Sequence, residues 1–172
     1  PYNGIRIRPN LLSIRDSLTD PTKRSFSFTS SYAGGVSSYV TPPRPQFSDD
    51  PTLQGGQLWV WSPDKATPPM RIELFSQYWK LGGSAGSPMW TYKAPDGSIS
   101  ITLKAEKLVI KAKGASVFSL AGAPQGRVAI QLKLGLEAGL CTVSNAGLSD
   151  GTVKFDGVLN GSRPSVCATI PG

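Results

Sequence analysis

Residues 98–134 decide the fold, and they read SISITLKAEKLVIKAKGASVFSLAGAPQGRVAIQLKL. Apolar residues alternate with polar or small residues over 99–104, 107–113 and 127–134. Because a period of two places successive side chains on opposite faces, each run predicts a strand with one apolar face and one polar, often cationic, face. Three such strands in so short a stretch predict an antiparallel sheet that packs on a second layer.

The alternation continues outward from this stretch in shorter segments, separated by turn signals. Asp96-Gly97 is the strongest of these signals, since glycine tolerates the positive φ that a hairpin turn requires. Further strands are expected at residues 5–8, 12–16, 25–29, 57–62, 70–74, 78–81, 89–93, 136–143, 152–155 and 166–170. The expected fold is all-β: an antiparallel two-sheet β-sandwich, jelly-roll or immunoglobulin-like, with about 10–12 strands.

The chain has 172 residues, which fits one domain able to bury roughly 70% of its unfolded surface. Because no internal repeat or shift in composition divides it, residues 1–172 are predicted to form a single β-sandwich domain. Residues 30–56 are rich in serine, glycine, proline and aspartate and predict a long loop. A loop of this length is either functional or a long crossover.

The formal net charge of +7 has two interpretations. The charge could attract the protein to an anionic surface, a nucleic acid or an acidic polysaccharide. Alternatively, it comes from lysines that protect exposed strands against aggregation. The second is favoured because the lysines are spread along strand faces, so no specific nucleic-acid partner is predicted. No apolar run is long enough for a membrane span. The start at Pro1, without a methionine, predicts a processed or excised piece.

Cys141 and Cys167 are the two cysteines of the chain. They form either a disulfide or two buried thiols, and the disulfide is preferred. A disulfide would stabilise the fold by about 3 kcal/mol and would indicate an extracellular or cell-surface location. Two cysteines without histidine do not complete a zinc site, so no metal or other cofactor is predicted.

The chain contains no histidine, which excludes Ser-His-Asp and Cys-His catalysis. Carboxylates remain as acid–base candidates, and Glu73, Glu106 and Asp96 are those within predicted strands or their turns. A glycosidase requires two carboxyl groups facing each other at roughly 5–9 Å, a geometry that the sequence does not reveal. We therefore predict a protein that is not an enzyme.

Aromatic residues are concentrated in the middle of the chain. The candidate binding residues are Trp59, Trp61, Tyr78, Trp79, Trp90 and Tyr92. If Leu58 and Val60 face the core, Trp59 and Trp61 lie on the outer face, where indoles stack on sugar rings. Alternatively these rings fill the core, lie under the long loop, or anchor an interface with a second copy or a neighbouring protein.

Several motifs resemble, in their order, an uncharacterised domain that recurs in predicted secreted proteins of myxobacteria and related deltaproteobacteria. The motifs are Asp20-Pro21-Thr22-Lys23-Arg24, the run DPTLQGG at 50–56, Tyr78-Trp79-Lys80, Trp90-Thr91-Tyr92-Lys93, the run KLVIKAKG at 107–114, the run PQGRVA at 124–129, Leu140-Cys141 and Cys167. The resemblance spans about residues 11–167. It implies a secreted, cell-surface module with no known activity. The tyrosine- and proline-rich loop at residues 32–47 departs from that pattern.

These observations predict a non-catalytic extracellular structural or assembly module, such as a subunit of a surface layer, a filament or an adhesion structure. The alternative is a carbohydrate-binding module that uses exposed tryptophans. The expected partners are further copies of the chain or a neighbouring surface protein, with a polysaccharide as the alternative.

Overall fold

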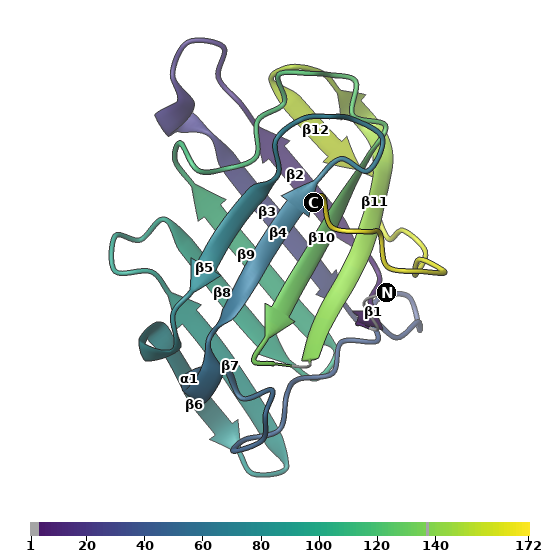
Figure 1. Cartoon of the computed structure of the whole chain (residues 1–172). Helices are drawn as coiled ribbons and strands as arrows, with labels where there is room; N and C mark the ends of the chain where they lie inside the picture. Colours follow the sequence, from purple (N-terminus) through teal and green to yellow (C-terminus); the bar gives the residue numbers. More distant parts are fainter. Residues whose placement is uncertain (1–3, 137) are drawn as a thin grey trace.

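The computed structural model describes residues 4–136 and 138–172, and in them the chain is almost entirely strand and loop (Figure 1). Helix accounts for 6%. The strands are β1 (Ile5–Arg6), β2 (Leu11–Arg15), β3 (Ser25–Ser31), β4 (Gly56–Trp61), β5 (Met70–Leu74), β6 (Trp79–Ser84), β7 (Ser87–Lys93), β8 (Ile99–Lys104), β9 (Lys107–Lys113), β10 (Arg127–Leu134), β11 (Ala138–Asp150) and β12 (Lys154–Gly157). The short helices are η1 (Pro21–Lys23), α1 (Pro51–Gln54) and η2 (Ser76–Tyr78).

The strands form one continuous sheet in the order β5-β4-β10-β11-β12-β2-β3-β9-β8-β7-β6, with β1 added in parallel beside β11. This sheet folds back on itself, so that β5, β4, β10 and β11 lie in front of β2, β3, β9 and β8 in Figure 1. The fold is all-β and mostly antiparallel, in a nearly closed, barrel-like arrangement. The two separate sheets of the expected sandwich are not confirmed.

The 13-residue strand β11 is the physical reason for the single sheet. Its first part pairs with β10, and its last part pairs with β12. The register shifts between Ala146 and Ser149, and such an irregularity bends a strand and increases its twist. One strand therefore passes from the front of the sheet to the back.

The prediction for residues 98–134 is confirmed, since the three alternating runs form β8, β9 and β10. Their inward residues are buried in one core, with Ile101, Ile110 and Ile130 each at most 2% exposed. β8 pairs with β9 through the two-residue turn at Ala105 and Glu106. The apolar face of each run thus supplies the burial that stabilises the sheet.

The strand expected at residues 166–170 is wrong. The structure has no strand there, and Val166 is 70% exposed. This segment pairs with no strand, and Cys167 is bonded to Cys141 of β11, with the two Cα atoms 5.7 Å apart. The predicted disulfide is confirmed, and it holds the C-terminal segment beside β1, where the Arg163 Nε donates to the Arg6 carbonyl at 2.8 Å.

In the described residues, no helix is both long enough and apolar enough to span a membrane.

Asp16, just after β2, ties three segments together. Its carboxylate accepts hydrogen bonds from Arg24 Nε and from the Leu120 N–H, each at 2.8 Å, and from the Ser17 N–H at 2.7 Å. Burial by itself would raise the pKa of Asp16, but these hydrogen bonds and the Arg24 charge outweigh it and lower the pKa below the ordinary aspartate value. The folded state therefore favours the ionised carboxylate.

This lowered pKa makes the fold less stable in acid. The stabilisation is fully present above the unfolded-state pKa of about 3.9 and is lost as the pH falls through the lower folded-state pKa. We expect Asp16→Asn to cost about 2 kcal/mol at neutral pH, the range for hydrogen bonds to a charged group. Urea unfolding between about pH 2 and pH 7 measures this, and an equal cost at both ends would contradict the assignment.

Candidate functional site

We call the region between the two end strands of the sheet the seam. β5 and β6 are the terminal strands of the pairing order, and residues 75–78, which include η2, connect them. In the part of the chain that the structure describes, neither strand pairs with a further strand on its outer side, although the short helix α1 contacts β6. An unpaired edge offers its backbone N–H and C=O groups to another strand, so the seam is the first place to examine for binding.

β6 is the more exposed of the two edges, since every residue after Trp79 is exposed. Ala85 and Gly86 form a two-residue turn between β6 and β7, and Ser84 pairs with Ser87. In an antiparallel pair, hydrogen-bonded and non-hydrogen-bonded positions alternate along each strand. Because Ser84 and Ser87 close the two-residue turn with hydrogen bonds, Gly82 and Lys80 also bond to β7. The backbone N–H and C=O of Leu81, which lies between them, point to the free edge. The Leu81 side chain is 46% exposed.

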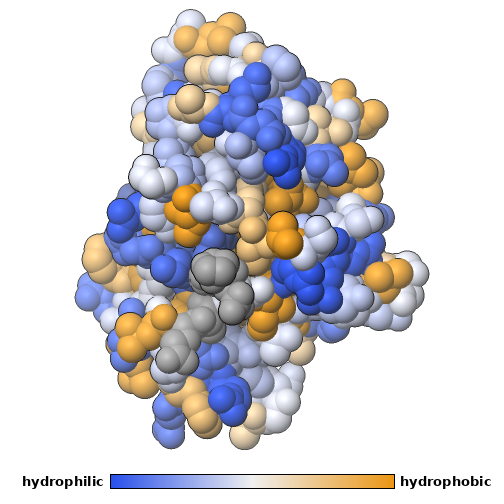
Figure 2. All heavy atoms as spheres, turned by 45° about the vertical axis from the view of Figure 1, so that its right-hand side comes forward, coloured by the Kyte–Doolittle hydropathy of each residue, from blue (hydrophilic) through white to orange (hydrophobic). Residues whose placement is uncertain are grey.

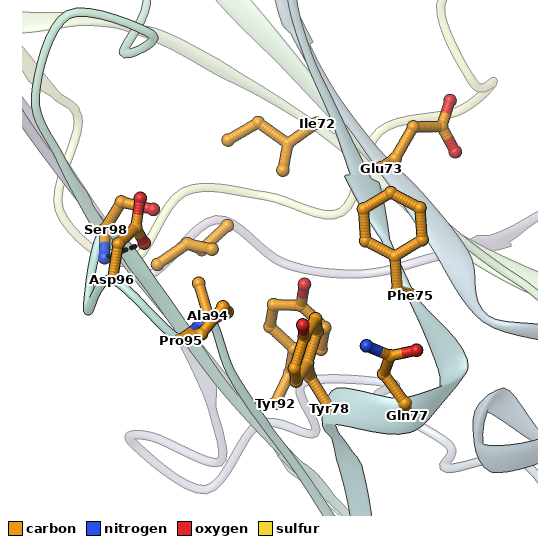
Figure 3. Close-up of a pocket in the computed structure, with 11 residues that line it drawn as sticks. Ile72, Glu73, Phe75, Gln77, Tyr78, Tyr92, Ala94, Pro95, Asp96 and Ser98 are labelled. Carbon is orange, nitrogen blue, oxygen red and sulfur yellow. Dashed lines mark hydrogen bonds between the residues drawn. The ribbon is translucent and has the colours of Figure 1, made fainter.

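Beside β5 the seam opens into a pocket of about 530 Å³. Its lining residues are Ile72, Glu73, Phe75, Gln77, Tyr78, Tyr92, Ala94, Pro95, Asp96, Ser98 and Ile99. Figure 3 shows the rings of Tyr78 and Tyr92 between Phe75 and Ala94, while the Glu73 carboxylate points away from them. The walls are thus mainly apolar, with few polar groups directed inward.

Tyr92 anchors the floor of this pocket. Its ring packs edge-on against Tyr78, with centroids 6.3 Å apart, and lies 5.2 Å from the Trp79 ring. Burial raises the pKa of the Tyr92 hydroxyl, although a hydrogen bond with the Phe75 backbone opposes this shift. The hydroxyl therefore stays protonated at neutral pH and remains a donor.

The predicted aromatic residues do not form an exposed platform. Trp61, Trp79, Trp90 and Tyr92 are at most 4% exposed, whereas Trp59 and Tyr78 are half-buried. Tyr78, Trp79 and Tyr92 are brought together at the seam, whereas Trp90 packs in the core.

Trp61 lies on the outer face of β4, as predicted, but the expectation that its indole is exposed is wrong. Gln131, on the outer face of the neighbouring strand β10, is also fully buried, so this face is covered. The Cys141–Cys167 bond holds the C-terminal segment on this face, and Figure 1 draws its end in front of β4 and β10. Sequence alternation alone does not reveal such a cover.

Trp59 is engaged by its neighbours on the same face. Its Nε1 donates to Gln57 at 3.2 Å, and the Arg71 guanidinium lies 5.1 Å over its ring. Glu73 in turn accepts from Gln57 at 2.9 Å and from Arg71 at 2.7 Å. Because a cation already covers part of this indole, the arrangement does not favour stacking by a sugar there.

The three carboxylates singled out in the sequence have structural partners. Asp96 accepts from the Ser98 N–H at 2.9 Å, and hydrogen bonds from Ser98 lower the pKa of Asp96. Glu106 accepts from Ser37 and Ser38 of the long loop, and these hydrogen bonds lower the pKa of Glu106. Glu73 is paired with Arg71. A general acid needs a raised pKa, and neither Asp96 nor Glu106 has one.

Sequence reasoning missed Phe75, Gln77 and Leu81. It ended the strand expected at residues 78–81 too early, since Gly82 and Gly83 also belong to β6. Glycine has no side chain, so these positions show no alternation of apolar and polar side chains and do not indicate a strand. Among residues 4–136 and 138–172, no three acidic or cysteine side chains are grouped in a way that would hold a metal ion.

The face shown in Figure 2 carries interspersed hydrophobic and hydrophilic residues, without one broad apolar area. The seam is therefore a better candidate than this face for contact with another protein.

No protein-family model matches the chain, and no curated protein or solved structure matches it either. The resemblance to a myxobacterial secreted domain thus stays a prediction, and the function has to be argued from the geometry above.

Proposed function

We propose that the chain is a non-catalytic extracellular assembly module that self-associates through the free edge of β6. The observation that carries this proposal is the combination of an unpaired terminal strand with almost complete exposure of its residues. Exposed edges of this kind are templates for strand addition by another chain. The disulfide supports an extracellular setting, because such bonds persist in oxidising compartments.

A second copy of the chain fits this edge by two-fold symmetry. In an antiparallel pair, directly opposite residues share a face, so Leu81 lies opposite Leu81 of the second copy and Lys80 lies opposite Gly82. This register buries two half-exposed leucines against each other and keeps the two lysines apart. The β7 ladder of each copy stays intact, because the groups that form the new bonds point away from β7.

A proline at position 81 tests whether self-association depends on backbone pairing at the β6 edge or on other contacts. We expect Leu81→Pro to weaken self-association at least tenfold, because it removes the N–H that points to the free edge but no bond to β7. Leu81→Ala is the matched control: it trims the side chain, keeps the N–H and should weaken association less. Sedimentation over a range of protein concentrations measures both, with circular dichroism to check folding.

A wild-type chain that remains monomeric up to millimolar concentration would overturn the proposal. Equal association of the wild-type and Leu81→Pro chains would also contradict it, since the contact would then lie elsewhere.

A further inference from the structure

The outward surface of β3, β9, β8, β7 and β6 gathers positive charge. Its exposed lysines, which define the lysine face, are Lys80, Lys93, Lys104, Lys107, Lys111 and Lys113. The five strands contain no aspartate or glutamate. In the described residues, none of the six ammonium groups forms an ion pair. The charge of this face is therefore not neutralised from within the fold.

The acidic residues nearest to these strands in the sequence form hydrogen bonds with serines instead of ion pairs with the lysines. Asp96, in the β7–β8 turn, holds the Ser98 N–H, as described above. Glu106, in the β8–β9 turn, accepts from the Ser37 hydroxyl at 2.6 Å and from the Ser38 N–H at 2.8 Å. Both carboxylates are fixed by backbone or hydroxyl groups and leave the lysines unpaired.

Strand register arranges the lysine face in rows. Lys111 lies opposite Ser27 on one side and Ser100 on the other, and Lys93 lies opposite Ser100. Neighbouring strands are about 4.8 Å apart, and alternate residues on one strand about 6.7 Å apart. Ammonium groups on flexible stems thus recur along and across the face, with hydroxyl groups between them.

One pair on this face is unfavourable without a ligand. Lys104 and Lys107 lie directly opposite each other across β8 and β9, and like charges in that position destabilise a sheet. An anionic group above the pair would remove the repulsion and gain two charge-assisted hydrogen bonds.

We infer that the lysine face binds an acidic polysaccharide, through its repeated sulfate or carboxylate groups. Hydroxyls such as those of Ser27, Ser100 and Thr102 both donate and accept hydrogen bonds and so match sugar hydroxyls. Single-stranded nucleic acid is held mainly by stacking on aromatic rings, but Trp79, Trp90 and Tyr92 of these strands are buried, as are Phe26 and Phe28. The broad, curved surface of five strands also does not fit the major groove of a duplex, which admits a helix or a two-stranded ribbon.

Dextran sulfate and unsulfated dextran test this inference, since they share a backbone and differ in charge. We expect the full chain to bind dextran sulfate and not dextran. The double variant Lys104→Gln, Lys107→Gln should bind at least tenfold more weakly at about 0.15 M salt, with a shallower dependence of log K on log salt. Its melting temperature should equal or exceed that of the wild type, because the repulsion is gone.

The matched control is Lys65→Gln, Lys133→Gln, which removes the same charge from positions outside the lysine face. We expect it to change affinity less than twofold. If both double variants lose the same affinity for dextran sulfate, the effect comes from net charge alone and the proposed site is wrong. Absence of binding to dextran sulfate by the wild-type chain would also overturn the inference. If the chain binds a single-stranded oligonucleotide more tightly than dextran sulfate, and the Lys104→Gln, Lys107→Gln variant loses this binding, the ligand of the lysine face is nucleic acid and not a polysaccharide.

Discussion

Trp90→Ala is expected to lower the free energy of unfolding by about 3–5 kcal/mol, the usual cost of removing a fully buried large aromatic ring. Trp90 has no exposed surface, and it lies between Leu81 of β6 and Leu103 of β8. Its Nε1 donates to the Pro43 carbonyl at 3.1 Å. The substitution therefore leaves a cavity in the core and also frees the long loop from its only tryptophan hydrogen bond in the described residues.

Urea unfolding followed by far-ultraviolet circular dichroism measures the cost of this substitution. Trp90→Phe is the informative companion: it keeps most of the ring but leaves the buried Pro43 carbonyl without a donor, at a cost of about 1–3 kcal/mol. Hydrogen exchange in residues 40–47 should rise in both variants. Exchange unchanged in Trp90→Phe would show that Trp90 fills space without holding the loop.

Removal of the disulfide, in the double variant Cys141→Ala, Cys167→Ala, should cost about 3 kcal/mol by the chain-entropy model. The two cysteines are 26 positions apart in the sequence. The loss should be larger than for an isolated loop, because this bond holds the C-terminal segment over a face that contains the buried Gln131 and Trp61.

Chemical unfolding of the oxidised, reduced and alanine forms tests this prediction. The reduced wild type and the alanine variant should agree within about 1 kcal/mol, and residues 160–172 should become sensitive to protease in both. An intact, protease-resistant tail after reduction would mean that contacts such as Arg163 with the Arg6 carbonyl are sufficient to hold it.

Local pattern was enough to predict the strands of the core. The alternation in β8 and β9 reports directly which side chains are inward, because each of these two strands has one wet face. The alternation in β10 also marks its inward residues, although Ala129 and Gln131 on its outer face are buried as well. The disulfide was also predictable, since two cysteines allow one pairing. Residues 166–170 show the limit of this reasoning: Val166, Ala168 and Ile170 alternate like a strand, but they pair with no strand in the structure.

The shape of the sheet and the candidate site depend on distant contacts. The polar run SNAGLSD at residues 144–150 has no strand pattern of its own, yet it completes β11 by pairing with β12. The burial of Trp61 was not predictable either, because local alternation does not place the C-terminal tail, whose end lies in front of β4 and β10 (Figure 1). The seam exists because β5 and β6 end the pairing order, and periodicity within a strand carries no information about that order.

The bond between Cys141 and Cys167 also fixes how a mechanical load would travel through the molecule. A force applied at the C-terminal end enters β11 through the sulfur bridge, at the residue that pairs with Arg6 of β1. Residues 142–166, which include β12, are bypassed by this path and carry no tension. A stretched, oxidised chain would thus lengthen from its N-terminal side, while the segment between the cysteines stays slack until a reductant opens the bridge.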